Sequence, residues 1–226
     1  DILLGCIVEM NSMKEYMTIL EHVTEEITEK KSKFIADIFN VESVQEAEDK
    51  IKDIKKKYYD ARHNCIAYRI IENGQIIEKA SDDGEPSGTA GGPMLNILQK
   101  RQICNAVVIV TRYFGGILLG TGGLVRAYSE VTQKAIDNSK IIKMVEGIEL
   151  EVILEYQEFE IFKHYCQKMN IIIENVEYSE NIKSRIKMEK NRKNIFLKDL
   201  ENKTLKILEY QLKEEKYINE NVEENK

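Results

Sequence analysis

The chain has 226 residues, of which 42% are hydrophobic and 32% charged, and its formal net charge is −6. This length suits two domains with ordinary apolar cores, whereas the negative charge does not support nucleic-acid binding through bulk charge. The four cysteines are scattered without a C-x-x-C pair, and no apolar run is long enough to span a membrane. The composition therefore favours a cytoplasmic protein without a disulfide framework or a zinc site.

The first domain is expected over residues 17–140, after an N-terminal extension at 1–16 that we expect to be loose or disordered. Alternating apolar residues predict a strand over 34–41. Ser43 and Glu46 then form a capping box, and apolar side chains recur at helical spacing after it. The domain thus begins with a strand followed by a helix.

A β-hairpin and a central strand come next. Residues 65–71 and 76–80 are expected to be strands, and the Asn73-Gly74 pair between them is typical of a type I′ turn. Residues 106–113 form a nearly continuous apolar run. Such a run predicts a strand buried on both faces of a sheet.

Glycine placement is the most informative feature of the sequence. Nine of the 12 glycines fall in two clusters, at 81–93 and 115–123. Glycine permits positive φ angles and close approach of the backbone to a partner. The clusters predict two unusual loops, each followed by a helix, at 93–100 and 124–138.

The second domain is expected over residues 144–218, with a disordered acidic tail at 219–226. Its patterns predict the order βαββαβ, which is typical of a split-βαβ, ferredoxin-like sandwich. The predicted strands are 148–156, 171–178, 184–189 and 204–213, and the predicted helices are 158–169 and 194–202.

The first glycine-rich segment carries three carboxylates, at Asp82, Asp83 and Glu85. Carboxylate oxygens suit Mg²⁺ and acid/base chemistry. They also suit a structural role, in which they accept hydrogen bonds from the loop's own N–H groups and pair with arginines. Both interpretations are open at this point, and no metal or cofactor is assigned.

The second segment does not meet the dinucleotide fingerprint, because Val125 stands where that motif requires glycine. A glycine loop that enters a helix still offers N–H groups to an anion, and guanidinium groups suit phosphate. In the alternative interpretation, Tyr113 and Phe114 pack in the core, and Arg112 and Arg126 pair with Asp82 or Asp83. The candidate binding residues here are Arg112, Tyr113, Gly115, Gly116, Gly122, Gly123 and Arg126.

His63 and its neighbours complete the candidate residues. His63 lies two positions before Cys65, so a Cys–His nucleophilic pair is one hypothesis. A structural, hydrogen-bonding His63 is the other, and it is favoured because no third group that would orient the pair is evident. Arg62 joins the candidate binding residues, and the basic run at 30–33 is either a solvated strand entrance or a phosphate contact.

Long motifs in the first domain closely resemble the Impact/YigZ family. They are KSKFIA at 31–36, DARHNCIAY at 60–68, SDDGEPSGTAG at 81–91, TRYFGGI at 111–117 and GGLVRAY at 122–128. The resemblance implies an α+β protein, with an N-terminal domain like domain 2 of ribosomal protein S5. It implies a ferredoxin-like C-terminal domain similar to domain V of elongation factor G.

The resemblance also implies a function. Eukaryotic members of the family act in translational control under amino-acid starvation by binding a protein partner. We therefore expect a non-enzymatic, translation-associated binding protein whose partner is RNA, the ribosome or a translation-regulatory protein. The alternatives are a small-molecule or nucleotide-dependent enzyme built on the glycine loops and the Asp82, Asp83 and Glu85 cluster, and a pure protein-interaction module. No catalytic residue and no oligomeric state follow from the resemblance.

Overall fold

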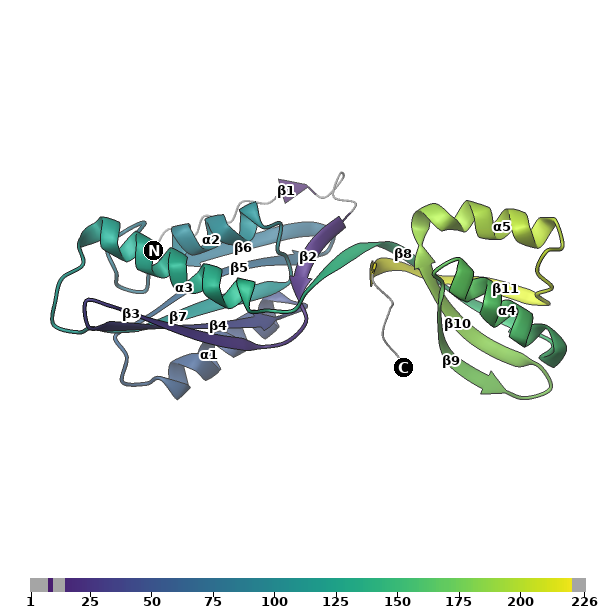
Figure 1. The fold of residues 1–226 in the computed structure, drawn as a ribbon, viewed down its shortest axis with the longest axis horizontal. Coiled ribbons are helices and arrows are strands. Elements are labelled where there is room, and N and C mark those ends of the chain that lie inside the picture. Colours follow the sequence, from purple (N-terminus) through teal and green to yellow (C-terminus); the bar gives the residue numbers. More distant parts are fainter. Residues whose placement is uncertain (1–7, 10–14, 221–226) are drawn as a thin grey trace. The chain divides into compact units, whose positions relative to one another are not determined.

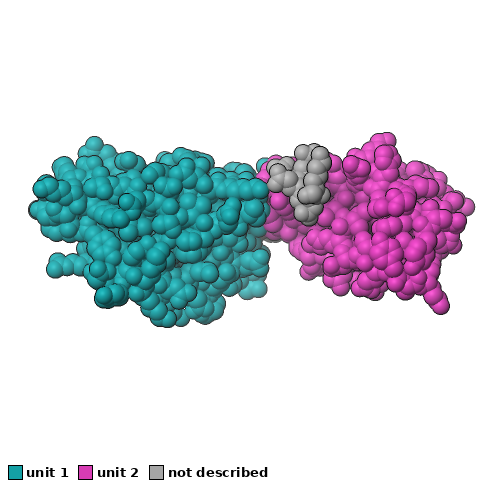
Figure 2. Space-filling view, turned by 60° about the horizontal axis from the view of Figure 1, so that its bottom comes forward, with its two compact units in different colours: residues 1–142 teal, residues 143–226 magenta. Residues whose placement is uncertain are grey.

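The structure is a computed structural model that describes residues 8–9 and 15–220. Packing divides the chain into two compact units, unit 1 at 1–142 and unit 2 at 143–226 (Figures 1 and 2). The predicted N-terminal extension and acidic tail lie largely outside the described residues. Within the described part of the chain, no helix is both long and apolar enough to cross a bilayer.

Unit 1 is built on a six-stranded antiparallel sheet with the strand order β1-β6-β5-β7-β4-β3 (Figure 1). The predicted strand at 106–113 is confirmed, and it lies in the interior of the sheet as β7. The strands are β1 (Val8–Glu9), β3 (Val23–Glu29), β4 (Ser32–Asn40), β5 (His63–Glu72), β6 (Gln75–Ser81) and β7 (Ala106–Tyr113). A short strand, β2 (Glu15–Ile19), packs beside them, where the Met17 N–H donates to the Gln102 carbonyl at 3.0 Å.

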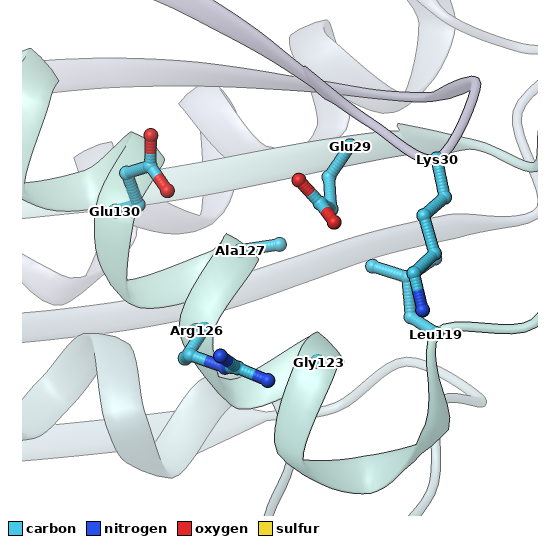
Figure 3. A pocket seen from close by; sticks show the side chains of 7 residues that line it. All are labelled: Glu29, Lys30, Leu119, Gly123, Arg126, Ala127 and Glu130. Carbon is cyan, nitrogen blue, oxygen red and sulfur yellow. The ribbon is translucent and has the colours of Figure 1, made fainter.

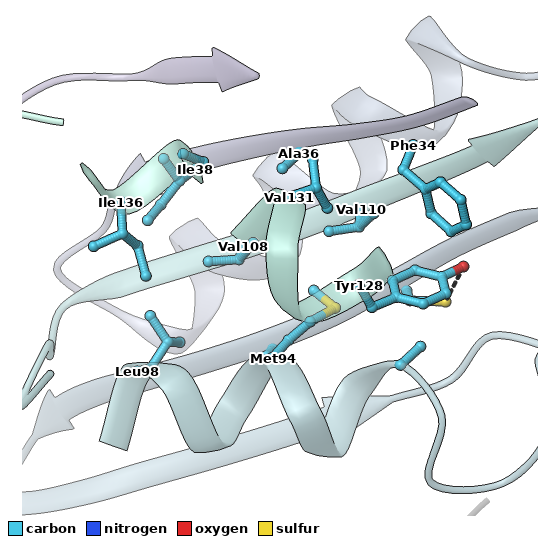
Figure 4. Packing of buried hydrophobic residues seen from close by; sticks show 14 of the residues in the cluster. Phe34, Ala36, Ile38, Met94, Leu98, Val108, Val110, Tyr128, Val131 and Ile136 are labelled. Carbon is cyan, nitrogen blue, oxygen red and sulfur yellow. Dashed lines mark hydrogen bonds between the residues drawn. The ribbon is translucent and has the colours of Figure 1, made fainter. Parts of the chain in front are cut away.

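Helices cover both faces of this sheet. α1 (Val44–Lys57) lies on one face, and α2 (Gly91–Lys100) and α3 (Gly120–Asp137) lie together on the other (Figure 1). Side chains along the inner strands alternate between the two layers: Val108 and Val110 pack with α2 and α3, whereas Val107 and Ile109 pack with α1. Figure 4 shows the α2/α3 layer, in which Met94, Tyr128 and Val131 are fully buried.

Two hairpins of the sheet are closed by two-residue turns of different chemistry. Asn73 and Gly74 have φ angles of +52° and +73°, as expected for a type I′ turn. Lys30 and Lys31, between β3 and β4, have φ angles of +46° and +65°. A left-handed conformation costs an ordinary L-residue roughly 1–2 kcal/mol, a cost that glycine avoids. The lysine turn is therefore strained relative to the Asn-Gly turn.

Unit 2 has the predicted order βαββαβ, and its four strands form an antiparallel sheet in the order β11-β8-β10-β9. One core packs the helices against this sheet, with Leu150, Phe162, Ile186 and Phe196 at its centre. The elements are β8 (Ile141–Leu154), α4 (Tyr156–Lys168), β9 (Ile172–Tyr178), β10 (Ile182–Glu189), the 3₁₀ turn η1 (Lys190–Arg192), α5 (Lys193–Glu201) and β11 (Glu209–Asn219).

Three boundaries differ from the predictions. α3 begins at Gly120, so half of the second glycine cluster is helical rather than a loop. α2 begins at Gly91, which makes Pro93 its third residue instead of its first. β11 begins at Glu209, five residues after the predicted start at Thr204. The capping box is confirmed in one half: Ser43 is the N-cap of α1, and its hydroxyl accepts from the Glu46 N–H at 3.1 Å. In the other half, the Glu46 carboxylate accepts from the Glu42 N–H at 2.9 Å instead of the Ser43 N–H.

Candidate binding site at one end of the first sheet

The two glycine-rich segments meet at one end of the unit 1 sheet. In the register of the strands, Lys33 at the start of β4 lies opposite Tyr113 at the end of β7. His63 at the start of β5 lies opposite Arg112. The first segment follows β6, the second follows β7, and the Lys30–Lys31 turn precedes β4. One end of the sheet thus carries nearly all of the predicted site residues.

Asp82 holds the first segment in shape. Its carboxylate accepts hydrogen bonds from the backbone N–H groups of Gly88 at 2.7 Å, Ala90 at 2.9 Å and Gly91 at 2.9 Å. The last two of these groups belong to the start of α2, which has no side-chain cap at its N-cap residue Ala90. Asp82 therefore performs the capping role for α2 from outside the helix.

Asp83 and His63 also find polar partners within the protein. The Asp83 carboxylate accepts from the Asn64 N–H at 2.8 Å and lies 3.1 Å from the Lys55 ammonium. The His63 Nδ1 lies 3.0 Å from the Asp83 carbonyl oxygen, which can only accept. The Nδ1–H of His63 therefore donates to that oxygen.

Glu85 and Arg112 form a buried ion pair, with 2.7 Å between Glu85 Oε1 and Arg112 Nη1. The same carboxylate oxygen accepts from the Tyr128 hydroxyl at 2.9 Å, and Arg112 Nη2 donates to the Ser32 hydroxyl at 3.4 Å. The guanidinium also lies over the rings of Phe34 and Phe114. Arg112 pairs with Glu85 instead of Asp82 or Asp83, and its side chain is 7% exposed. It is not a surface group that can clamp phosphate.

Cys65 does not have the character of a nucleophile. Its thiol is buried, and its single S–H has two acceptors in reach, the Asp82 carbonyl oxygen at 3.0 Å and the Tyr128 hydroxyl oxygen at 3.3 Å from the sulfur. Burial raises the pKa of this thiol to about 12, so the reactive thiolate is scarce near neutral pH. His63 hydrogen-bonds Asp83 rather than Cys65, and the geometry therefore supports the structural interpretation of His63.

The second segment is fastened to the Lys30–Lys31 turn. The Gly115 N–H donates to the Ser32 hydroxyl at 3.1 Å. A Cβ atom at Gly115 would lie only 1.9 Å from the Lys31 carbonyl carbon, so the two backbones touch where no side chain fits. Gly116 follows with a φ angle of +85°. The hairpin turn and the second segment therefore form one structural unit, which we call the tip (residues 29–33 and 114–119).

Apolar side chains project from the tip. Phe114 is 53% exposed, Ile117 43% and Leu118 83%. They lie within five consecutive residues. Leu119, the next residue, is buried and fixes the loop to the core beside α3.

A shallow pocket lies between the tip and α3, lined by Lys30, Leu119, Gly123 and Arg126 (Figure 3). Arg126 is exposed, and its Nε donates only to the Gly122 carbonyl at 3.3 Å, within its own helix. Figure 3 shows two carboxylates, Glu29 and Glu130, along the same pocket, so its charge is mixed. Gly122 and Gly123 lie in the first turn of α3, where no side chain caps the helix.

Arg62 and Tyr113 lie at the same end of the sheet. Arg62 is exposed. The Tyr113 hydroxyl donates to the Asp60 carboxylate at 2.7 Å, and this hydrogen bond raises the pKa of Tyr113 to about 12. Among the described residues, Lys30, Lys31, Arg62 and Arg126 have no ion-pair partner, which distinguishes them from the buried Arg112.

Two features of the tip were not predicted from the sequence. They are the exposed Leu118 and the turn at Lys30 and Lys31. A signal for Leu118 was present, because Ile117-Leu118-Leu119 is an apolar run bracketed by glycines. The three carboxylates of the first segment do not converge on one point: each has its own protein partners. Within the described part of the chain, no group of three or more acidic, histidine or cysteine side chains is placed to hold a metal ion.

On the face of the unit 2 sheet away from its helices, the described charged side chains pair with one another. Residues of β8 and β10 alternate between core and charged positions, and the charged ones neutralise one another. Lys183 pairs with Glu151 at 3.2 Å, Arg185 lies 3.7 Å from Glu149, and Lys187 pairs with Glu174 at 2.6 Å. The described cations on this face are thus paired, unlike Lys30, Lys31, Arg62 and Arg126 at the sheet end of unit 1.

Comparison with known proteins identifies the class of protein. Residues 30–136 match the family model of the Impact N-terminal domain. IMPACT family member YvyE of Bacillus subtilis (strain 168) is 38% identical over 184 residues, which cover 81% of this chain and 84% of that protein. IMPACT family member YigZ of Escherichia coli (strain K12) is 42% identical over 116 residues, or 50% of this chain and 55% of that protein.

A solved structure agrees with the fold. A crystal structure described as that of a hypothetical protein superposes with a TM-score of 0.57 and 30% sequence identity, covering 87% of this chain and 98% of that one. This chain belongs to the IMPACT family. The family predicted from the glycine-rich motifs is therefore confirmed, and the mixed α+β architecture with antiparallel sheets agrees with the predicted fold class.

Proposed function

We propose that this protein is a non-enzymatic, translation-associated binding protein, and that it contacts a ribosomal or translation-regulatory partner through the sheet end of unit 1. The observation that carries the proposal is a group of four exposed cations at this sheet end, Lys30, Lys31, Arg62 and Arg126, none of which has an ion-pair partner among the described residues. Lys31, Arg62 and Arg126 lie within the motifs that define the family, and Lys30 directly precedes the first of them. The link to translation rests on the resemblance of those motifs to a family whose eukaryotic members act in translational control.

The domain folds named by the resemblance support the same proposal. We infer a fold like domain 2 of ribosomal protein S5 for unit 1 and a ferredoxin-like fold, similar to domain V of elongation factor G, for unit 2. The βαββαβ order and the antiparallel strand order β11-β8-β10-β9 support the second assignment. Both folds recur in proteins that work on the ribosome.

The contacts of the three carboxylates support a scaffold role over the enzymatic alternative. A carboxylate that holds Mg²⁺ must direct an oxygen toward the ion. Asp82 instead binds backbone N–H groups, and Glu85 is buried against Arg112. The cluster serves as the internal scaffold of the first segment.

Sucrose-gradient sedimentation of cell lysate tests the proposal. The native protein is expected to migrate with ribosomes, and the Arg62→Ala/Arg126→Ala variant to shift toward free protein. Both arginines are exposed, so their removal is expected to leave the stability of unit 1 within about 0.5 kcal/mol of the parent. Arg112 is unsuitable for this test, because removing it leaves Glu85 buried and unpaired.

A matched variant guards against a general loss of positive charge. Lys163→Ala/Lys198→Ala removes two lysines on the helices of unit 2 and is expected to leave co-migration unchanged. If native protein runs only as free protein, or if both double variants lose co-migration equally, the proposal fails.

A further inference from the structure

Lys30 and Lys31 adopt positive φ angles that lysine disfavours. The Asn73–Gly74 turn of the same sheet closes an equivalent hairpin with residues that favour positive φ, whereas lysine does not. Backbone strain of this kind persists where the surrounding structure enforces it, and it concentrates at functional sites. The contact of Gly115 with the Lys31 backbone provides that enforcement.

The turn presents positive charge beside exposed apolar surface. Lys30 and Lys31 are exposed and have no ion-pair partner among the described residues. The loop fastened to them exposes Phe114, Ile117 and Leu118. An exposed apolar group next to unpaired cations is complementary to a surface that has the opposite charge and an apolar pocket.

We infer that the tip docks onto an acidic protein segment that carries apolar side chains, with Leu118 as the apolar anchor and Lys30 and Lys31 as the cationic contacts. This inference rests on the proposed function and names the partner class for its binding surface. An acidic amphipathic helix has the required chemistry, because its apolar side chains form one face and its carboxylates border that face.

The side chains of the tip favour protein over RNA. Single-stranded RNA is recognised by stacking of bases on aromatic rings along a basic groove. Ile117 and Leu118 are aliphatic and cannot stack. The aromatic Phe114 already lies with its ring 5.6 Å from the Arg112 guanidinium carbon. Burial of Leu118 against the apolar side chains of a protein segment is the contact that its exposure suits.

Nuclear magnetic resonance titration of the full chain tests this inference with three defined probes. The first is a short peptide of repeated Glu-Glu-Leu, the second replaces its leucines by serine, and the third is an oligouridylate of equal charge. We expect the first probe to shift the amide resonances of Lys31 and Leu118. We expect it to bind about tenfold more tightly than the other two, since burial of a leucine contributes an affinity factor of this order.

Three variants separate charge, apolar contact and strain. Leu118→Ser and Lys30→Gln/Lys31→Gln are each expected to weaken binding of the first peptide about tenfold. Lys30→Asn/Lys31→Gly is expected to weaken it equally and to raise the melting temperature of unit 1 by about 2–4 °C or more, because it relieves the strain. Lys30→Gln/Lys31→Gln keeps ordinary L-residues at the two positive φ angles, so the strain remains and the melting temperature is expected to be unchanged.

The outcomes distinguish this inference from the proposed function. Three outcomes would overturn the inference, whatever the sedimentation result. They are tighter binding of oligouridylate than of the leucine peptide, no binding of the peptide, and peptide binding that Leu118→Ser does not weaken. Peptide binding at the tip without ribosome co-migration would support the inference and remove the translational assignment. A melting temperature unchanged by Lys30→Asn/Lys31→Gly would show that the turn is not strained, which would overturn the argument that its strain marks a functional site.

Discussion

The two glycine-rich segments of unit 1 have similar compositions and opposite architectures. The first turns its polar side chains inward: the Asp82 carboxylate binds three backbone N–H groups, and Glu85 is buried against Arg112. The second packs its backbone against the neighbouring hairpin and leaves Phe114 and Leu118 in solvent. A dense glycine cluster therefore marks unusual backbone, and the direction of the adjacent side chains decides whether that backbone forms a scaffold or a binding surface.

The largest effect is expected where the two segments are joined. Arg112→Ala leaves the Glu85 carboxylate buried without its cation, and the loss of one partner of a buried pair costs about 3–5 kcal/mol of the free energy of unfolding. Urea denaturation of unit 1 measures this loss. Arg126→Ala, which removes an exposed arginine from the second segment's helix, is the matched control and is expected to change stability by less than about 0.5 kcal/mol.

The contrast between the two segments is wrong if Arg112→Ala and Arg126→Ala change the free energy of unfolding by the same amount. Equal, small losses would mean that Arg112 is hydrated in solution and that the two segments are not joined by a buried pair. Glu85→Gln provides a second measurement, because it keeps the size of the side chain and the hydrogen bond to Tyr128 while it removes the charge. A loss smaller than that of Arg112→Ala is expected.

Local patterns predicted much of the fold. The strand at 106–113 and the Asn73–Gly74 turn follow from apolar runs and turn chemistry within a few residues. β3, at 23–29, lies outside the predicted elements because it is an edge strand: three of its seven residues are glutamates, and its apolar positions are only half buried. The turn at Lys30 and Lys31 carries no turn signature, since its conformation is set by the strands it joins and by Gly115.

The site was harder to predict than the fold. The sequence indicated which residues gather at the sheet end, but the Arg112–Glu85 pairing joins residues 27 positions apart and depends on the path of the chain between them. Burial separates the three candidate arginines, which residue type alone did not distinguish. Arg112 was an attractive phosphate ligand by residue type, and the exposed Arg62 and Arg126 are the ones available to a partner.

Gly115 tests whether the second segment depends on contact between backbones. Gly115→Ala places a Cβ against the Lys31 carbonyl group, where backbone rather than a flexible side chain must move. We expect a loss of about 1–3 kcal/mol, the range for overpacking in a rigid site, and changed amide resonances at Lys31. Gly122→Ala is the matched control: nothing lies within 4 Å of its added Cβ, and a gain of about 0.5–1 kcal/mol is expected from helix propensity. A tolerated Gly115→Ala would mean that the tip is not one structural unit.

Of the three substitutions argued in full, Asp82→Ala is expected to have the smallest effect on stability. It also distinguishes the first segment, as a scaffold, from the tip, as a binding surface. Asp82→Ala removes the acceptor for three N–H groups, two of them at the start of α2, and a loss of about 1–2 kcal/mol is expected from the missing cap. Because the first segment is a scaffold, binding of the leucine peptide to the tip is expected to persist. Leu118→Ser is expected to show the reverse pattern, with unchanged unfolding and lost binding. If Asp82→Ala abolishes peptide binding while unit 1 stays folded, the first segment belongs to the binding surface, and the division between the two segments is wrong.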